Sequence, residues 1–81
     1  MLRLRALSGN DVLKIFSHFG FDAISQKGSH VKLRRTLENG LKQTLTIPRH
    51  KELDRGTLMA IYRQALRYLP EKDLRPYFYK K

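Results

Sequence analysis

Residues 28–48 read GSHVKLRRTLENGLKQTLTIP, and this stretch carries the clearest structural pattern in the chain. Val31 and Leu33 alternate with polar residues, as in a strand that has one face buried. The Asn-Gly pair at residues 39–40 is the strongest short-range signal for a hairpin. The alternation then resumes, with the leucines and isoleucine on one side, until Pro48 ends the strand. The stretch predicts two antiparallel strands with one apolar face and one polar, basic face.

A third strand and a first helix are expected before this hairpin. Residues 21–26 suit a short strand, and the Lys-Gly-Ser sequence at 27–29 suits the turn that leads to the next one. Further upstream, Ser8 is a good N-cap and Asp11 lies three residues later, as in a capping box. Apolar residues then recur at helical spacing, and Gly20 follows where a helix commonly closes. The pattern predicts one helix followed by three strands.

A second helix is expected after the third strand. Residues 48–56, PRHKELDRG, form a loop in this interpretation, and Thr57 or Asp54 caps the helix that follows. One face of that helix is apolar, and it consists of Leu58, Ile61, Tyr62, Ala65 and Leu69. The proline after this face should end the helix. Residues 71–81 are expected to add one helical turn and then, from Tyr77, a loosely held end.

The predicted order is therefore α-β-β-β-α, an α+β domain. Both helices and the sheet have one apolar surface, so the simplest arrangement packs both helices on one face of a three-stranded antiparallel sheet. This is the layout of a double-stranded-RNA-binding-like domain, although topology alone does not give function. We expect a single domain over residues 1–81, with a motif-bearing core at 8–69 and a C-terminal extension at 70–81.

The net charge of the chain limits the classes of molecule that it is expected to bind. The 81 residues include 17 Lys and Arg against 7 Asp and Glu, a net charge of +10. Such a chain is expected to bind a polyanion: RNA, DNA, an acidic protein or an anionic membrane surface. The absence of cysteine excludes disulfides, a thiolate nucleophile and Cys-based zinc sites. No apolar run is long enough to span a membrane and the first residues do not resemble a signal peptide, so a cytoplasmic location is expected.

The basic excess is concentrated in residues 24–36, which carry four cations and no acid. His30, Lys32 and Arg34 should share the polar face of one strand. An imidazole can give or take a proton near neutral pH, and two cations beside it could hold a phosphate. Gly28 would let that phosphate approach the backbone closely. A histidine that only hydrogen-bonds the turn, on a face that only aids solubility, is the alternative.

The other histidines are less informative. His18 is expected to be a surface residue of the first helix. His50 could transfer a proton, contact a phosphate or pin the loop before the second helix. No metal site is expected, because no carboxylate lies at a recognised ligand spacing from His30 or His50. No small-molecule cofactor is expected either, because the chain is short and has no phosphate-loop or dinucleotide motif.

Several short motifs together resemble one known family. They are Ser8 at the start of the first helix, Gly20-Phe21, Gly28-Ser29-His30, Ile47-Pro48-Arg49-His50, and Gly56-Thr57-Leu58 with Ile61. In this order and spacing, from about Ser8 to Leu69, the chain resembles the HicA (YcfA-like) toxin family. Residues 1–7 and those after Leu69 lie outside the motifs.

The resemblance implies a small mRNA interferase with a double-stranded-RNA-binding-like fold, whose relatives cleave RNA without a known metal requirement. It implies that His30 is catalytic and that a HicB antitoxin covers the active face. On this interpretation Lys32 and Arg34 bind the RNA backbone, Gly28 and Ser29 shape its approach, and His50 is a further RNA-binding residue. The role of His50 in the chemistry is left open.

Two other functions fit the same composition. A non-catalytic RNA-binding module would use the basic face and would not need His30. A protein-interaction domain would dock an acidic partner on that face and would not bind RNA at physiological salt.

Overall fold

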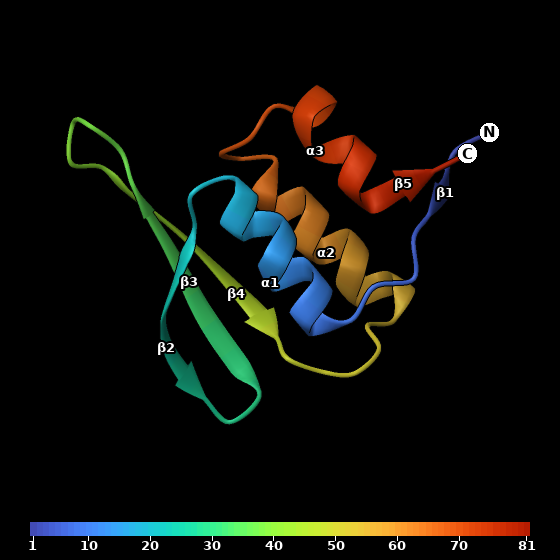
Figure 1. Ribbon diagram of the computed structural model, residues 1–81, viewed down its shortest axis with the longest axis horizontal. Coiled ribbons are helices and arrows are strands. Elements are labelled where there is room, and N and C mark those ends of the chain that lie inside the picture. Colours follow the sequence, from blue (N-terminus) through green and yellow to red (C-terminus); the bar gives the residue numbers. More distant parts are fainter.

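The computed structural model describes residues 1–81 and contains a three-stranded antiparallel sheet, three helices and a small two-stranded sheet (Figure 1). The elements are β1 (Arg3–Leu4), α1 (Gly9–His18), β2 (Asp22–Lys27), β3 (His30–Thr36), β4 (Lys42–Pro48), α2 (Arg55–Ala65), α3 (Glu71–Phe78) and β5 (Tyr79–Lys80). The predicted α+β class is confirmed. The segment from α1 to α2 has the predicted α-β-β-β-α order, and β1, α3 and β5 are additional elements.

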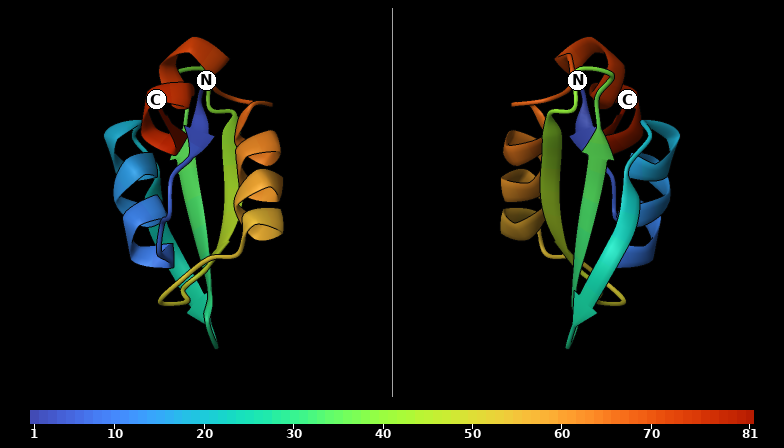
Figure 2. Two further views of the ribbon diagram at one scale, coloured as in Figure 1. Left: turned by 90° about the vertical axis from the view of Figure 1, so that its right-hand side faces the viewer. Right: turned by 90° about the vertical axis from the view of Figure 1, so that its left-hand side faces the viewer.

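The larger sheet has the strand order β2-β3-β4. β3 and β4 pair along their full length, from His30 opposite Pro48 to Thr36 opposite Lys42. Both α1 and α2 lie on one side of this sheet, with α2 beside β4 (Figure 2). The predicted packing of two helices on one sheet face is therefore confirmed.

Alternation along β3 and β4 buries one face of the sheet. Val31, Leu33, Leu45 and Ile47 are each at most 3% exposed and join a single core of 16 buried residues. Burying an aliphatic side chain contributes about 1.5–3 kcal/mol, so these residues hold the sheet to the helices. Leu41 is one of the leucines that the alternation placed on this buried face. That prediction is wrong for Leu41, because the residue precedes β4 and is 62% exposed.

Two glycines make the hairpin turns. Gly28 and Gly40 have φ of +60° and +88°, a region that disfavours residues with a Cβ. Lys27 pairs with His30, so Gly28 and Ser29 form a two-residue loop with the positive φ first, as in a type II′ turn. The predicted hairpin of β3 and β4 is also confirmed. Its turn is not the type I′ turn that Asn-Gly favours, because Asn39 has a negative φ.

Side-chain caps fix the start of each main helix. Ser8 Oγ accepts a hydrogen bond from the Asp11 amide at 3.0 Å, and the Asp11 carboxylate accepts one from the Ser8 amide at 2.9 Å. The predicted capping box is therefore confirmed. For α2, Asp54 is the N-cap, and its side chain accepts from both the amide and the hydroxyl of Thr57. The sequence left Asp54 and Thr57 as alternatives, and the structure selects Asp54.

The C-terminal segment differs most from expectation. α2 ends at Ala65, before the proline that was expected to stop it, and Pro70 is instead the N-cap of the separate helix α3. Phe78 is fully buried against Phe16 and Tyr62, and β5 pairs with β1. The predicted loosely held end is wrong, because the aromatic residues of this segment close one end of the core. The two termini lie side by side there (Figure 1).

None of the helices has the length and apolar character that a membrane crossing requires.

Replacing Phe78 by Ala should lower the free energy of unfolding by about 3–5 kcal/mol, because the substitution empties a fully enclosed site in the core. Tyr77→Ala is the matched control, since the Tyr77 side chain is 38% exposed and its removal should cost clearly less. Urea unfolding of the full chain measures both values. A smaller loss for Phe78→Ala than for Tyr77→Ala would contradict this account of α3.

Candidate functional site

The outer face of the sheet carries the predicted cationic residues. His30 and Lys32 are exposed and Arg34 is half-buried, while Val31 and Leu33 between them are buried. The structure therefore brings these three polar side chains of β3 to one face, as expected.

Arg35 is the neighbouring cation in the same basic run, but it has a structural role. Its guanidinium donates to Gln43 Oε1 at 2.6 and 2.8 Å and to the Phe19 carbonyl at 3.0 Å. It also lies 4.9 Å from the centre of the Phe21 ring. Arg35 thus covers the end of the core and donates a hydrogen bond to a carbonyl at the end of α1. This cation therefore stabilises the fold and is not part of the exposed basic face.

The turn before β3 and the loop after β4 are joined by hydrogen bonds. The Arg49 amide donates to the Ser29 carbonyl, and His50 Nε2 lies 3.2 Å from Ser29 Oγ. Ser29 and His50 are 21 residues apart in sequence, and the β3–β4 pairing brings them together because His30 lies opposite Pro48. Two of the predicted site residues, Ser29 and His50, therefore contact each other directly.

Arg49 fastens this loop to two other elements. Its guanidinium donates to Asn10 Oδ1 at 2.9 Å and to Gln26 Oε1 at 3.2 Å, and Gln26 Nε2 donates to the Gly28 carbonyl at 2.9 Å. One arginine thus links the start of α1, the end of β2 and the Gly28 turn. The sequence pattern did not single out Arg49 for this role.

The start of α1 also packs directly against the same loop. The Gly9 amide donates to the His50 carbonyl at 2.8 Å. A Cβ at Gly9 would collide with the Pro48 oxygen and would lie 2.7 Å from the Arg49 Cα, a distance that real Cβ contacts do not reach. Glycine is therefore required at position 9 so that the loop carrying His50 can approach the helix.

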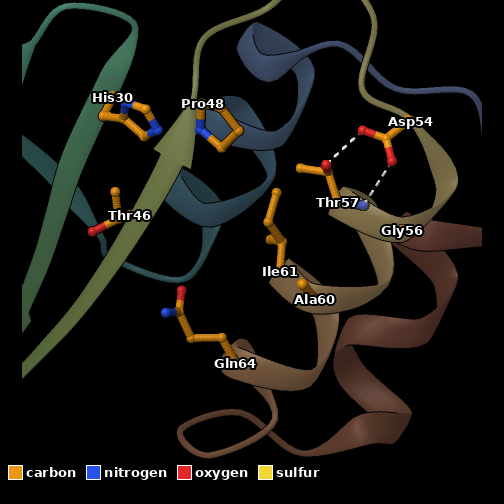
Figure 3. A pocket seen from close by; sticks show the side chains of 9 residues that line it. All are labelled: His30, Thr46, Pro48, Asp54, Gly56, Thr57, Ala60, Ile61 and Gln64. Carbon is orange, nitrogen blue, oxygen red and sulfur yellow. Dashed lines mark hydrogen bonds between the residues drawn. The ribbon is translucent and has the colours of Figure 1, made fainter.

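A pocket of about 470 Å³ opens beside His30. It lies between helix α2 and β4, which is an edge strand of the sheet. The side chains of His30 and Thr46 lie on one side of β4 and those of α2 on the other (Figure 3). Its lining residues are His30, Thr46, Pro48, Asp54, Gly56, Thr57, Ala60, Ile61 and Gln64.

The sequence pattern did not assign a functional role to Thr46, Asp54 or Gln64. The strand register could have placed Thr46 opposite Lys32, but the position of α2 is a property of the three-dimensional packing. Hydrogen bonds from the Thr57 hydroxyl and amide lower the pKa of the Asp54 carboxyl from its ordinary value. The pocket therefore has a carboxylate at one end at neutral pH.

The remaining candidates lie elsewhere. His18 is exposed, as expected, and stacks on Tyr77 with 5.8 Å between ring centres. No group of three His, Cys, Asp or Glu side chains is arranged to hold a metal ion.

Residues 9–66 match the family model described as the HicA toxin of bacterial toxin–antitoxin systems. The chain belongs to the HicA toxin family. The match covers all the predicted site residues and the pocket, whereas α3 and β5 lie outside it. HicA membership makes the protein the toxin of a toxin–antitoxin pair and implies an antitoxin as its partner. No curated protein and no solved structure matches the chain significantly.

Gly9→Ala should destabilise this HicA protein by about 1–3 kcal/mol, because the added methyl group meets backbone atoms that cannot turn aside. Gly56→Ala is the matched control: a Cβ there meets only a side-chain oxygen at 3.3 Å, and alanine is the better helix former. Urea unfolding gives both values. Equal stability of Gly9→Ala and the wild type would contradict the close approach of the loop.

Proposed function

We propose that this HicA toxin is an endoribonuclease that cleaves messenger RNA at a site centred on His30. The proposal rests on the family match together with one geometric observation, an exposed imidazole that shares a sheet face with Lys32 and Arg34. RNA contains its own nucleophile, the 2′-hydroxyl, so a single positioned base can begin its cleavage. Such a group typically contributes about 10²–10⁴-fold to the rate.

The proposed step is a transesterification in which His30 is the general base. The imidazole takes the proton of the 2′-hydroxyl while O2′ forms a bond to phosphorus and the bond from phosphorus to O5′ breaks. The O5′ leaving group takes a proton from water, and the imidazolium returns its proton to the resulting hydroxide. The products are a 2′,3′-cyclic phosphate and a 5′-hydroxyl, and no metal ion is needed to balance the step.

Two groups of residues would assist His30. Lys32 and Arg34 would hold the RNA backbone and offset negative charge that develops on the phosphoryl oxygens. Gly28 would let the backbone approach closely, because its left-handed conformation leaves the turn without a side chain. Ser29 and His50, 3.2 Å apart, would add hydrogen bonds to a phosphate beside the turn.

The antitoxin in this proposal is a HicB-like protein that covers the face carrying His30. The chain has a net charge of +10, so an acidic surface on the antitoxin would be attracted to the same face that attracts RNA. Antitoxin and RNA would then compete for one face, and the antitoxin would inhibit the toxin without any conformational change in it.

His30→Ala should abolish RNA cleavage by the purified protein in EDTA, a loss of at least about 10²-fold, without changing stability, because the side chain faces solvent. His18→Ala is the matched control and should cleave like the wild type. Gel analysis of a defined RNA measures the rate, and a substrate with a 2′-deoxy group at the cleaved position should resist all variants. Equal cleavage by His30→Ala and the wild type would contradict the role of His30.

Lys32→Ala and Arg34→Ala should each weaken RNA binding and reduce the slope of log K against log salt by about 0.7, the value for one lost contact to a single strand. Binding is measured in the His30→Ala background so that the RNA stays intact. Lys72→Ala, which removes an exposed cation from α3, should leave the slope unchanged. RNA binding without cleavage by the wild type would favour the non-catalytic module instead.

A further inference from the structure

The pocket beside His30 is adjacent to the cationic face but differs from it in chemistry. None of its nine lining residues is Lys or Arg, in a chain that has 17 of them, and one is the carboxylate of Asp54. A phosphate would meet an acid and no cation there. The charge distribution therefore separates a phosphate-binding face from a neighbouring site for an uncharged group.

We propose that this pocket binds one nucleobase of the RNA substrate, that of a nucleotide adjoining the phosphate held at His30, and thereby selects the cleavage site. The proposal rests on the proposed ribonuclease function and deepens it by naming the part of the substrate that the enzyme reads. The pocket volume, about 470 Å³, lies within the usual range of small-molecule sites.

The lining matches the two kinds of surface that a base presents. Pro48 and Ala60 offer apolar surface to the flat face of a base, and the buried Ile61 closes the pocket beneath them (Figure 3). Thr46 and Gln64 carry a hydroxyl and an amide that make no hydrogen bond within the protein, so both groups are free to bond to the edge of the base. An amide that both donates and accepts can distinguish one base edge from another.

The register also places the two sites within the reach of one nucleotide. Thr46 is the direct cross-strand partner of Lys32, and such partners have Cβ atoms about 4.5–5.5 Å apart. His30 belongs to both sites, since it lines the pocket and shares a face with Lys32. A phosphate bound at Lys32 and His30 would therefore bring an adjoining base to the edge of β4, where the pocket opens.

The first test is a cleavage assay on four RNAs that differ only in the base next to the cleaved bond. The wild type should prefer one base by about tenfold, which is the discrimination that one good base contact provides. Thr46→Val and Gln64→Ala should reduce that preference to about threefold or less, because cleavage of the favoured RNA slows when its base loses a hydrogen bond. Thr36→Val is the matched control at the far end of β3 and should keep the full preference. An unchanged preference in both pocket variants would overturn the proposal.

The second test does not depend on cleavage. The four nucleoside monophosphates and ribose 5-phosphate are each titrated into the ¹⁵N-labelled full chain. At least one nucleotide should shift the amide signals of Thr57, Ala60 and Gln64, whereas ribose 5-phosphate should not. Ala60→Phe fills the pocket from an exposed position and should abolish these shifts, while Ala6→Phe, also at an exposed alanine, should keep them.

The two tests separate the pocket from the proposed enzyme. Base-dependent shifts at the pocket in a protein that cleaves no RNA would support the base site and contradict the ribonuclease. Cleavage with no base-dependent shifts, or identical shifts with ribose 5-phosphate, would overturn the base site and leave the ribonuclease standing.

Discussion

The pairing of β3 with β4 is the constraint on which the rest of the molecule depends. Side chains alternate between the two faces of a strand, so burying Val31 and Leu33 against the helices necessarily exposes His30 and Lys32. A slip of one residue would exchange the two sets and place charged groups in the core. The same register therefore stabilises the fold and builds the cationic face, and substitutions that loosen the core would also disturb the site.

The candidate site nevertheless combines segments that are distant in sequence. The Gly28 turn, the loop after β4 and the start of α1 meet through Arg49, and Gly9 permits their contact because it has no side chain. Small side chains also shape the pocket, where Gly56 and Ala60 of α2 face the edge of β4. Hydrogen bonds between these segments therefore hold the site together at the rim of the core.

Sequence periodicity was sufficient for the elements whose structure is local. The hairpin, the capping box at Ser8 and the exposed residues of β3 all follow from patterns within a few residues. Phe78 could not be placed in this way, because Pro76 suggested a broken helix and only the packing against Phe16 shows why the segment is ordered. Arg35 was indistinguishable from Lys32 by charge, although strand parity assigns it to the inner face.

In the proposed enzyme, affinity and selectivity come from different parts of the surface. A net charge of +10 attracts any polyanion, and contacts to phosphates carry no sequence information. Discrimination needs a place where cations are absent, since there the fit of a base and its hydrogen bonds decide the binding energy. The pocket at the edge of β4 meets this condition, because Asp54 repels phosphate while Thr46 and Gln64 stay free. A strongly basic toxin can then bind many RNAs and still cleave selectively, because the cations that would hold the phosphate lie on β3 and the pocket that would hold the base opens at the edge of β4.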